Sequence, residues 1–335
     1  MFEFDVVNGR TVRDIVRDGR RDIVRVVRDT YLAHHAGRSV NPDSYFLRFP
    51  EKPADRIIAL PAYLDGEREV AGIKWIASFP ANIERGIPRA SATLVLNDAE
   101  TGYPFALLEA SQISAARTAA SAVLAADVLT GGRKGGRLAV VGAGIIARNI
   151  LEFFHAEQWT FEQVVVHDLS QEYGTALAAH ATERLAYPAS YAETLQEAVS
   201  GADLVVFATT AGEPYVLEPD AFAPGQIVLN ISLRDIGPEL IVGSYNVLDD
   251  VDHCLKANTS PHLAEQKYGN RDFITGTLAE VINGEVTVGT DKPVVFSPFG
   301  LGVLDLAVGL EVHRVAAESG RVTAIADFFG ETERW

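Results

Sequence analysis

The second half of the chain alternates short apolar segments with helical segments, and this alternation constrains the fold more than any other feature of the sequence. From Leu138 onward, apolar segments such as LAVV, VVV, LVVF and IVLN are separated by stretches with helical spacing or by turns. Strands that are apolar along their whole length are typical of a parallel sheet covered by helices on both faces. The sequence therefore predicts an α/β fold with a parallel sheet in this region.

The first of these strands runs into the glycine-rich stretch VVGAGIIA, which opens a helix. Gly142 permits a tight turn, Gly144 lets the backbone approach a pyrophosphate, and Ala147 keeps the helix close to the strand. The N-terminus of that helix favours negative charge. Asp168 ends the next strand about twenty residues later, where an acidic residue is expected to bind the ribose hydroxyls of the dinucleotide. Although glycines can also serve only a tight turn, the combination indicates a Rossmann-type domain that binds a dinucleotide.

Asp168 also indicates which dinucleotide binds. A carboxylate accepts hydrogen bonds from both ribose hydroxyls and repels a 2′-phosphate. No Lys or Arg follows Asp168 until Arg184, so little compensates that repulsion. We therefore expect NAD as the cofactor, bound at the glycine-rich turn and at the ends of the strands. The predicted cofactor-binding residues are Gly142, Gly144, Ile145, Ile146, Asp168, Thr209 and Ser232.

The first part of the chain has a different pattern. A stretch from Val12 to Gly37 has apolar residues at helical spacing and predicts one amphipathic helix. The β-prone segments SYFLRF, RIIALPAYL, GIKWIAS and ATLVLND follow, and the Pro, Gly and Asp residues between them indicate an antiparallel sheet. A turn at residues 101–104 predicts a hairpin. An Ala-rich helix then begins near Ser111, a candidate N-cap.

These two patterns predict two domains. A chain of 335 residues exceeds a comfortable single core, and the glycine-rich stretch TGGRKGGR lies where the pattern changes. We place the NAD-binding domain at residues 129–304. The second domain is α+β and comprises residues 1–128 together with residues 305–335, because the long C-terminal helix is expected to return to the N-terminal region.

Composition excludes several classes of partner. The formal net charge is −16, which argues against nucleic acid or an anionic membrane surface, because both demand a basic face. The N-terminus lacks the charged and then apolar pattern of a signal peptide, and no apolar run reaches membrane-spanning length. We expect a cytoplasmic protein. No His and Cys residues have the spacing of a zinc site, so no metal is expected.

Two cations in the first part of the chain are candidates for substrate binding. Lys74 lies between Ile73 and Trp75 in a strand, so its side chain points to the opposite face from theirs. It could pair with a carboxylate or, with a pKa lowered by burial, move a proton. Arg117 interrupts a helix of small residues and has no acid near it in the sequence. Its guanidinium is therefore suited to bind a substrate carboxylate through two parallel hydrogen bonds. Either side chain could instead serve structure or reach to water.

Further charged candidates are less specific. Arg48, Arg56, Arg85 and Arg89 are possible substrate ligands or surface residues. Asp235 follows a strand of the parallel sheet, at the edge where such sheets bind ligands, and it could act as a general acid or base. Its alternative role is a helix cap.

Together these residues resemble the ornithine cyclodeaminase/μ-crystallin family. The resemblance rests on GIKW with Lys74, DAETGYPFALLEAS leading into RTAA with Arg117, VVGAGIIA, and LRDIGPEL with Asp235, in that order. It covers almost the whole chain. The stretches ADRIIALPAYL, NIERG and LNDAETGYPFALLEAS are most similar to the branch that acts on N-(2-amino-2-carboxyethyl)-L-glutamate. Ile58 stands where the cyclodeaminases of the family carry a substrate-reading glutamate, which argues against ornithine.

The resemblance implies an activity and an assembly. The expected reaction is NAD-dependent oxidative hydrolysis of N-(2-amino-2-carboxyethyl)-L-glutamate to L-2,3-diaminopropionate and 2-oxoglutarate, a source of precursors for siderophores or peptide antibiotics. Lys74 and Arg117 would contact a substrate carboxylate, and Lys74 and Asp235 would serve the proton steps. A substrate with three carboxylates would need several cations, which Arg48, Arg56, Arg85 and Arg89 could supply. The family also implies a homodimer formed through the substrate domain.

Other activities within the family fit the same motifs. An alanine dehydrogenase, a ketimine reductase or a cyclodeaminase would need to bind only one carboxylate, and the additional arginines would then be surface residues. A non-catalytic protein that binds nucleotides or small ligands is a further alternative. The presence of Lys74, Arg117 and Asp235 argues for chemistry, because a binding protein would not need this acid and base.

Overall fold

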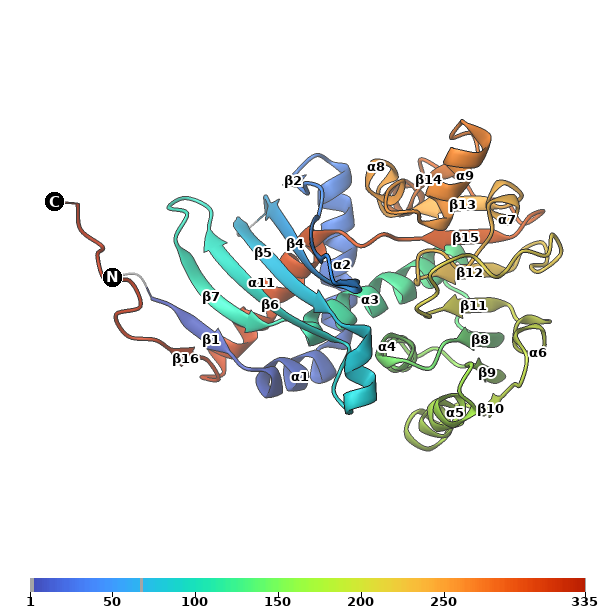
Figure 1. Ribbon diagram of the computed structural model, residues 1–335, viewed down its shortest axis with the longest axis horizontal. Coiled ribbons are helices and arrows are strands. Elements are labelled where there is room, and N and C mark those ends of the chain that lie inside the picture. The colour runs from blue at the N-terminus through green and yellow to red at the C-terminus, as the bar shows by residue number, and fades with distance from the viewer. Residues whose placement is uncertain (1–2, 67–68, 335) are drawn as a thin grey trace. The chain divides into compact units, whose positions relative to one another are not determined.

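The computed structural model describes residues 3–66 and 69–334, which form two compact units (Figure 1). The first unit runs from the N-terminal region to Arg117 and includes the chain from Leu301 onward, while the second comprises Thr118–Gly300. The division falls within the helix α3 (Ser111–Leu129), whose residues therefore belong partly to each unit. The chain enters the second unit through α3 and leaves it just before the helix α11 (Gly302–Glu318).

The first unit is built on one mixed sheet of eight strands. The spatial order is β16-β1-β7-β6-β5-β4-β2, with β3 paired to β4. The β1–β7 pair is parallel, and the other pairs are antiparallel, as the β-prone segments predict. The predicted hairpin joins β6 to β7. The strands are β1 (Asp5–Val7), β2 (Ser39–Val40), β3 (Tyr45–Phe49), β4 (Lys52–Leu64), β5 (Val70–Ser78), β6 (Ala90–Asp98), β7 (Pro104–Glu109) and β16 (Thr323–Ala324).

The C-terminal helix α11 packs on one face of this sheet, as expected for a segment that returns to the N-terminal region (Figure 1). On β6 the buried residues Ala92, Leu94 and Leu96 alternate with less buried ones, so only one face meets the helix. Contact is close at Gly309, because a Cβ there would lie 2.1 Å from Cδ2 of Leu94. The apolar strand residues and α11 thus form the core of the first unit.

The N-terminal amphipathic segment forms two helices, α1 (Gly9–Asp18) and α2 (Arg20–His35), so the prediction of one helix was wrong. Gly19 separates them with φ −105° and ψ 19°, outside the helical region. A glycine weakens a helix at such a position because it gains no stabilisation from a side chain and adopts other conformations easily. The apolar stripe continues across the break, with Ile15, Val16, Ile23 and Val27 buried.

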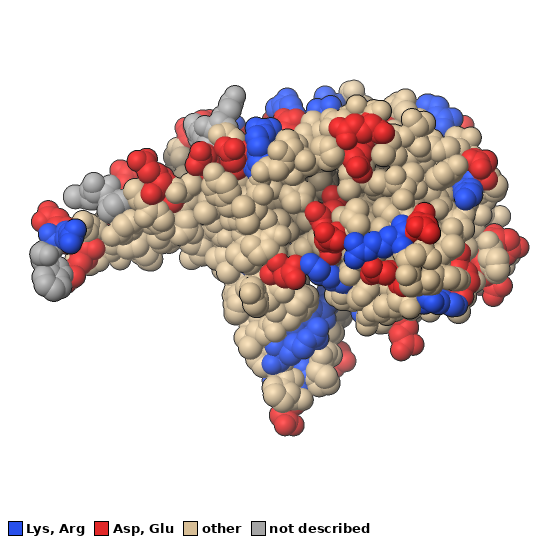
Figure 2. All heavy atoms as spheres, turned by 90° about the horizontal axis from the view of Figure 1, so that it is seen from above, with Lys and Arg blue, Asp and Glu red and all other residues tan. Residues whose placement is uncertain are grey.

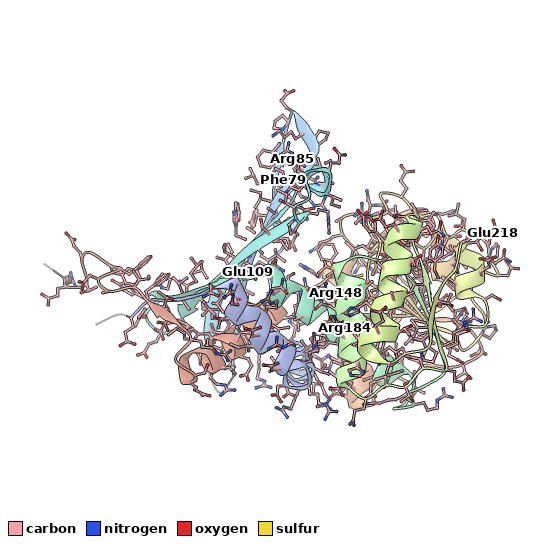
Figure 3. All side chains as sticks on the ribbon, turned by 90° about the horizontal axis from the view of Figure 1, so that it is seen from below. Phe79, Arg85, Glu109, Arg148, Arg184 and Glu218 are labelled. Carbon is pink, nitrogen blue, oxygen red and sulfur yellow. The ribbon has the colours of Figure 1, made fainter. Side chains whose placement is uncertain are left out.

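Helix α3 begins at Ser111, but the side chain of Glu109 caps it in place of the predicted Ser111. The Glu109 carboxylate accepts hydrogen bonds from the backbone N–H groups of Ser111 (2.7 Å) and Gln112 (3.4 Å). A carboxylate at this end of a helix is favoured by the helix dipole as well as by the unpaired N–H groups. Figure 3 shows Glu109 where the strand β7 ends.

The second unit confirms the predicted Rossmann-type α/β fold. Its eight strands are all parallel, in the order β10-β9-β8-β11-β12-β15-β13-β14, and the central ones are buried on both faces. The strands are β8 (Arg137–Val141), β9 (Gln163–His167), β10 (Ala189–Tyr191), β11 (Leu204–Phe207), β12 (Ile227–Asn230), β13 (Tyr245–Leu248), β14 (Ile274–Thr277) and β15 (Val294–Ser297). The helices are α4 (Ile145–Ala156), α5 (Gln171–Leu185), α6 (Leu195–Val199), α7 (Pro238–Val242), α8 (Val251–Cys254), α9 (Ser260–Tyr268) and α10 (Leu278–Asn283).

Candidate active site

The glycine-rich turn between β8 and α4 has the conformation that the dinucleotide motif requires. Gly142 has φ +96°, and a Cβ there would lie 2.5 Å from the backbone oxygen of Ala208, so only glycine fits. Gly144 precedes α4, and no heavy atom lies within 4 Å of where its Cβ would be, which leaves space for a pyrophosphate. Ala147 is fully buried and brings α4 close to the sheet. These residues fit a dinucleotide at the N-terminus of α4.

Asp168 lies directly after β9, beside this turn. Its carboxylate accepts hydrogen bonds from the backbone N–H groups of Ala143 (2.7 Å) and Ser170 (2.8 Å). Arg184 lies near the far end of α5, roughly 20 Å along the helix from its first residue. The arginine is therefore too distant along the helix to neutralise a 2′-phosphate beside Asp168. Ile145 is 49% exposed and Ile146 half-buried, so both predicted residues lie at the surface of this region.

Asp235 is completely buried in the second unit, and its carboxylate accepts hydrogen bonds from three hydroxyl groups. Ser232 Oγ donates to Oδ2 at 2.5 Å, while the Tyr215 hydroxyl donates to Oδ1 at 2.9 Å, and the Thr209 hydroxyl also donates to Oδ1. Thr209 follows β11 and Ser232 follows β12, which are neighbours in the sheet. The structure thus brings together three of the predicted residues, with Thr209 and Ser232 holding the carboxylate of Asp235.

Tyr215 is a residue of this cluster that the sequence reasoning missed. Burial, reinforced by the charge of Asp235, raises the pKa of the Tyr215 phenol well above its usual range. The phenol therefore stays protonated and keeps donating to Asp235. A carboxylate has four lone-pair positions, and these three hydroxyls donate to three of them.

Lys74 and Arg117 meet in the first unit at a buried acid, Asp305. The ammonium of Lys74 donates to Asp305 Oδ2 at 2.5 Å and to Ser114 Oγ at 3.2 Å. Arg117 Nε donates to Asp305 Oδ1 at 3.2 Å. The side chains of Lys74, Arg117 and Asp305 are 1%, 12% and 0% exposed, respectively. Arg117 has no acid near it in the sequence, as expected, but the fold supplies Asp305 as a partner that is distant in the sequence.

The environment of Lys74 lowers its pKa. Burial lowers it most, Asp305 raises it, and the positive charge of Arg117 lowers it, with the result that the pKa falls from the ordinary 10.5 to about 8. The side chain is therefore charged at neutral pH but can release its proton within the range in which enzymes work. This agrees with either role considered for Lys74, as a partner of a carboxylate or as a group that moves a proton.

Three of the other arginines cluster near the same face of the sheet. Arg48 pairs with Arg56 across β3 and β4, and Arg56 pairs with Ser78 across β4 and β5. Ser78 lies four residues from Lys74 on the same strand, so their side chains share a face. Arg89 joins this row because its Nη1 donates to Ser78 Oγ at 2.9 Å. Burial lowers the pKa of the Arg89 guanidinium, and an arginine side chain keeps its charge in proteins.

Arg85 lies apart from the row. It ends the short 3-10 helix η1 (Pro80–Arg85) and is exposed. Figure 3 shows it beside Phe79 on an arm that projects from the first unit, and Figure 2 shows basic side chains along that arm. The Phe79 ring packs against Phe49, with the ring centres 5.6 Å apart, and so ties η1 to β3. Arg48, Arg56, Arg85 and Arg89 all remain predicted substrate ligands, but Arg85 has no place in the strand register and hydrogen bond that link the other three to the strand of Lys74.

Among residues 3–66 and 69–334, no group of three or more His, Cys, Asp or Glu side chains is arranged to hold a metal ion. In the same part of the chain, no helix is long and apolar enough to span a membrane. A Rossmann domain with an NAD-fitting turn, together with buried acids and cations, is typical of nicotinamide-dependent oxidoreductases.

The chain belongs to the ornithine cyclodeaminase/mu-crystallin family, whose sequence profile matches residues 21–320. A relative in Staphylococcus aureus (strain NCTC 8325 / PS 47), N-((2S)-2-amino-2-carboxyethyl)-L-glutamate dehydrogenase, is 30% identical over 313 residues, which are 90% of this chain and 92% of that protein. The cofactor of this chain is NAD. The protein is an NAD-dependent dehydrogenase that acts on a C–N bond.

Solved structures share the whole fold. The Δ1-pyrroline-2-carboxylate reductase of Thermococcus litoralis, in complex with NADH and L-proline, superimposes with a TM-score of 0.88 and 23% identity, covering 96% of this chain and all of that one. An archaeal alanine dehydrogenase dimer with bound NAD superimposes with a TM-score of 0.85 and 23% identity, covering 98% of this chain and all of that one. At these identities the likeness confirms the fold.

Proposed function

We propose that this protein catalyses the oxidative hydrolysis of N-(2-amino-2-carboxyethyl)-L-glutamate. The reaction consumes the substrate, NAD⁺ and water and yields 2-oxoglutarate, L-2,3-diaminopropionate, NADH and a proton. The 30% identical relative, which is named for this compound, supports the proposal. We also propose that the enzyme works in the cytoplasm, and its single cysteine suits a reducing compartment.

The observation that carries this proposal is the gathering of cations at one face of the first unit's sheet. Lys74, Arg56 and Arg48 share that face through strand register, Arg89 binds Ser78 there, and Arg117 meets Lys74 at Asp305. The chain as a whole carries a formal charge of −16, so this concentration of positive charge is local. A substrate with three carboxylates needs such a set, whereas alanine needs only one cation or a pair.

The cationic side chains differ in how deeply they are buried. Lys74 and Arg117 are the more buried and suit the carboxylate next to the carbon that is oxidised. Ser78 lies four residues along β5 from Lys74, roughly 13 Å between their Cα atoms. Arg89 and Arg56 lie beside Ser78 and would bind a distal carboxylate of a substrate that extends along the strand from Lys74. Each charged pair formed in a partly buried place should contribute binding energy and orient the substrate.

Gly142, Gly144 and Asp168 would hold NAD, which would supply a hydride acceptor for the glutamyl Cα. Oxidation of the substrate at that carbon gives an imine between the carbon and the bridging nitrogen. Water then adds to the imine carbon, and the carbinolamine collapses when its nitrogen gains a proton. Asp235 is suited to accept and return these protons, because its carboxylate is fixed by Thr209, Tyr215 and Ser232. Lys74, with a pKa of about 8, is the second candidate for a proton step.

The direct test is an assay with NAD and N-(2-amino-2-carboxyethyl)-L-glutamate, which follows the absorbance of NADH and identifies both products by mass spectrometry. We expect equal amounts of NADH, 2-oxoglutarate and L-2,3-diaminopropionate. L-Alanine, L-proline and L-ornithine serve as comparison substrates, since proteins of the same fold include an alanine dehydrogenase, a reductase in complex with L-proline and a cyclodeaminase that recognises L-ornithine. Preferred use of one of these would reject the proposed substrate, and failure with every substrate would leave a binding protein.

The row of cations predicts unequal effects for two neighbouring arginines. Arg89→Met should raise KM for the three-carboxylate substrate roughly tenfold or more, because it removes a half-buried guanidinium that binds Ser78. Arg85→Met tests the exposed arginine of the projecting arm and should change KM less than threefold. Steady-state kinetics at neutral pH measures both. Equal and small effects would remove the support for a pocket that binds three carboxylates.

We further propose that the enzyme is a homodimer formed through the outer face of the first unit's sheet. That face carries apolar side chains that are only half-buried or exposed, among them Ile57, Ile73, Trp75, Val95 and Leu107. Trp75 is 43% exposed, which is unusual for so large an apolar side chain in the middle of a sheet. The similar archaeal alanine dehydrogenase is described as a dimer. A second copy of this chain is the partner that would cover the face.

Analytical ultracentrifugation of a protein with one substitution tests the proposed dimer. Trp75→Glu should convert a dimer into monomers at micromolar concentration, because the partner's apolar face would have to bury a charge. Tyr173→Glu, which changes an exposed aromatic residue on α5 of the second unit, is the control and should leave the dimer intact. A wild-type protein that sediments as a monomer at the same concentration would contradict the assembly.

A further inference from the structure

Asp305 stands out as a buried acid with no role yet in the proposed reaction. It lies in the first turn of α11, among apolar residues, and none of its surface is exposed. Its two oxygens are divided between two cations, with Oδ2 bound to Lys74 and Oδ1 bound to Arg117. One carboxylate therefore holds side chains from β5 and α3 in fixed positions relative to each other.

The charges of these three groups do not cancel. Two cations and one anion leave a single positive charge, in a place where the three side chains are at most 12% exposed. An uncompensated buried charge is unfavourable, so the binding of one more anion stabilises the cluster. Because Arg117 uses Nε for Asp305, its two terminal nitrogens are the donors suited to a carboxylate in the bidentate geometry.

We propose that Asp305 is a positioning residue, which holds Lys74 and Arg117 side by side with one positive charge in excess and so makes a receptor for a single carboxylate group. This inference deepens the proposed function and rests on it, since it assigns the receptor to the carboxylate beside the reacting carbon. Asp305 would not touch the substrate. It would act through the two cations, by fixing their directions and by keeping the ammonium of Lys74 charged.

The groups around Lys74 allow this effect to be measured. Asp305 from α11 and Arg117 from α3 are the charged groups that act on the ammonium, Ser114 from α3 accepts one of its hydrogen bonds, and the opposing residues on β4 and β6 are Leu60 and Leu94. Asp305 favours the charged ammonium, while Arg117 disfavours it. Removal of Asp305 should therefore lower the pKa of Lys74, whereas removal of Arg117 should raise it.

The experiment is NMR of protein labelled with ¹³Cε-lysine and saturated with NAD, titrated from pH 6 to pH 11. The chain has only six lysines, so Lys74→Arg identifies the signal of Lys74. Asp305→Asn should lower the pKa of Lys74 below its wild-type value of about 8, and Arg117→Met should raise it. Asp29→Asn, which changes an exposed acid of the same unit, should not move it.

Ligand binding supplies the second readout. 2-Oxoglutarate serves as the probe because it has carboxylates but no amine that titrates in this range, and pyruvate is the probe with one carboxylate. Asp305→Asn should weaken 2-oxoglutarate binding more than tenfold at pH 8 but less than threefold at pH 6, where Lys74 remains charged. Asp305→Glu should restore the wild-type pH profile, because it keeps the charge, although binding stays weaker because the longer side chain shifts the two cations.

The outcomes separate this inference from the proposed substrate. The titration of Lys74 and the binding of pyruvate do not depend on turnover, so a protein that fails to oxidise N-(2-amino-2-carboxyethyl)-L-glutamate could still show both effects. A variant at Asp305 that weakens binding equally at every pH, with an unchanged pKa of Lys74, would reduce Asp305 to a structural residue. If Asp305→Asn fails to fold, an unchanged Lys74 titration in Arg117→Met would also overturn the proposal.

Discussion

Asp235→Asn is expected to lower kcat by roughly 10²- to 10⁴-fold, the range that general acid–base catalysis contributes. The amide cannot accept a proton, but it has nearly the size of the carboxylate and can still bind the hydroxyls of Thr209, Tyr215 and Ser232. The fold and the glycine-rich turn should therefore persist. Stopped-flow and steady-state measurement of NADH formation gives kcat, and fluorescence titration gives the affinity for NAD.

The control for this variant is Asp220→Asn, which changes an exposed acid of the same unit. It should leave kcat and NAD affinity within twofold of wild type. If Asp235→Asn retained more than a third of the wild-type kcat, the proton steps would have to be assigned elsewhere. A large loss of NAD affinity in Asp235→Asn would instead indicate that this cluster serves the cofactor.

Lys74→Met is expected to lower kcat/KM by roughly 10²- to 10³-fold with little loss of stability. Truncation of one partner in a buried, hydrogen-bonded charge pair typically costs about 2–5 kcal/mol in binding. Stability should suffer less, because Asp305 keeps Arg117 as its partner and the remaining pair is neutral. The substitution thus removes the excess positive charge of the buried cluster, and with it the group that binds a substrate carboxylate. Kinetics and thermal unfolding, measured side by side, test both parts.

Lys52→Met, at an exposed position of the same unit, is the matched control and should leave both quantities unchanged. The pH dependence adds a second check on Lys74. Its charged form, present below about pH 8, is the form that would bind a carboxylate, so inhibition by 2-oxoglutarate should weaken as the pH rises through that value. An inhibition constant that stays flat from pH 6 to pH 10 would show that the charge of Lys74 is not used.

Local sequence patterns predicted a large part of this structure. The strand pattern and the stretch VVGAGIIA predicted the Rossmann fold, because fully buried strands and a glycine with positive φ leave a signal within a few neighbouring residues. The alternation around Lys74 likewise predicted that its side chain faces away from Ile73 and Trp75. The break at Gly19 was also visible in the sequence, but the apolar periodicity that continues across it suggested one helix.

The partner of Lys74 could not be predicted in this way. Asp305 is 231 residues away in the sequence, and the two meet only because α11 returns to the sheet of the first unit. The available signal was an isolated acid in the apolar stretch GVLDLAVG, but nothing in that stretch says which cation it binds. Tyr215 was missed for a similar reason, since an aromatic residue in a loop carries no local sign that it donates to Asp235.

The most direct test of the central claim is the fate of the hydrogen on the glutamyl Cα. N-(2-amino-2-carboxyethyl)-L-glutamate deuterated at that carbon is incubated with the enzyme and NAD, and the NADH formed is analysed by mass spectrometry. Our account predicts one deuterium in each NADH, together with unlabelled L-2,3-diaminopropionate. NADH without deuterium, or no NADH from this substrate while a simple amino acid is oxidised, would contradict it.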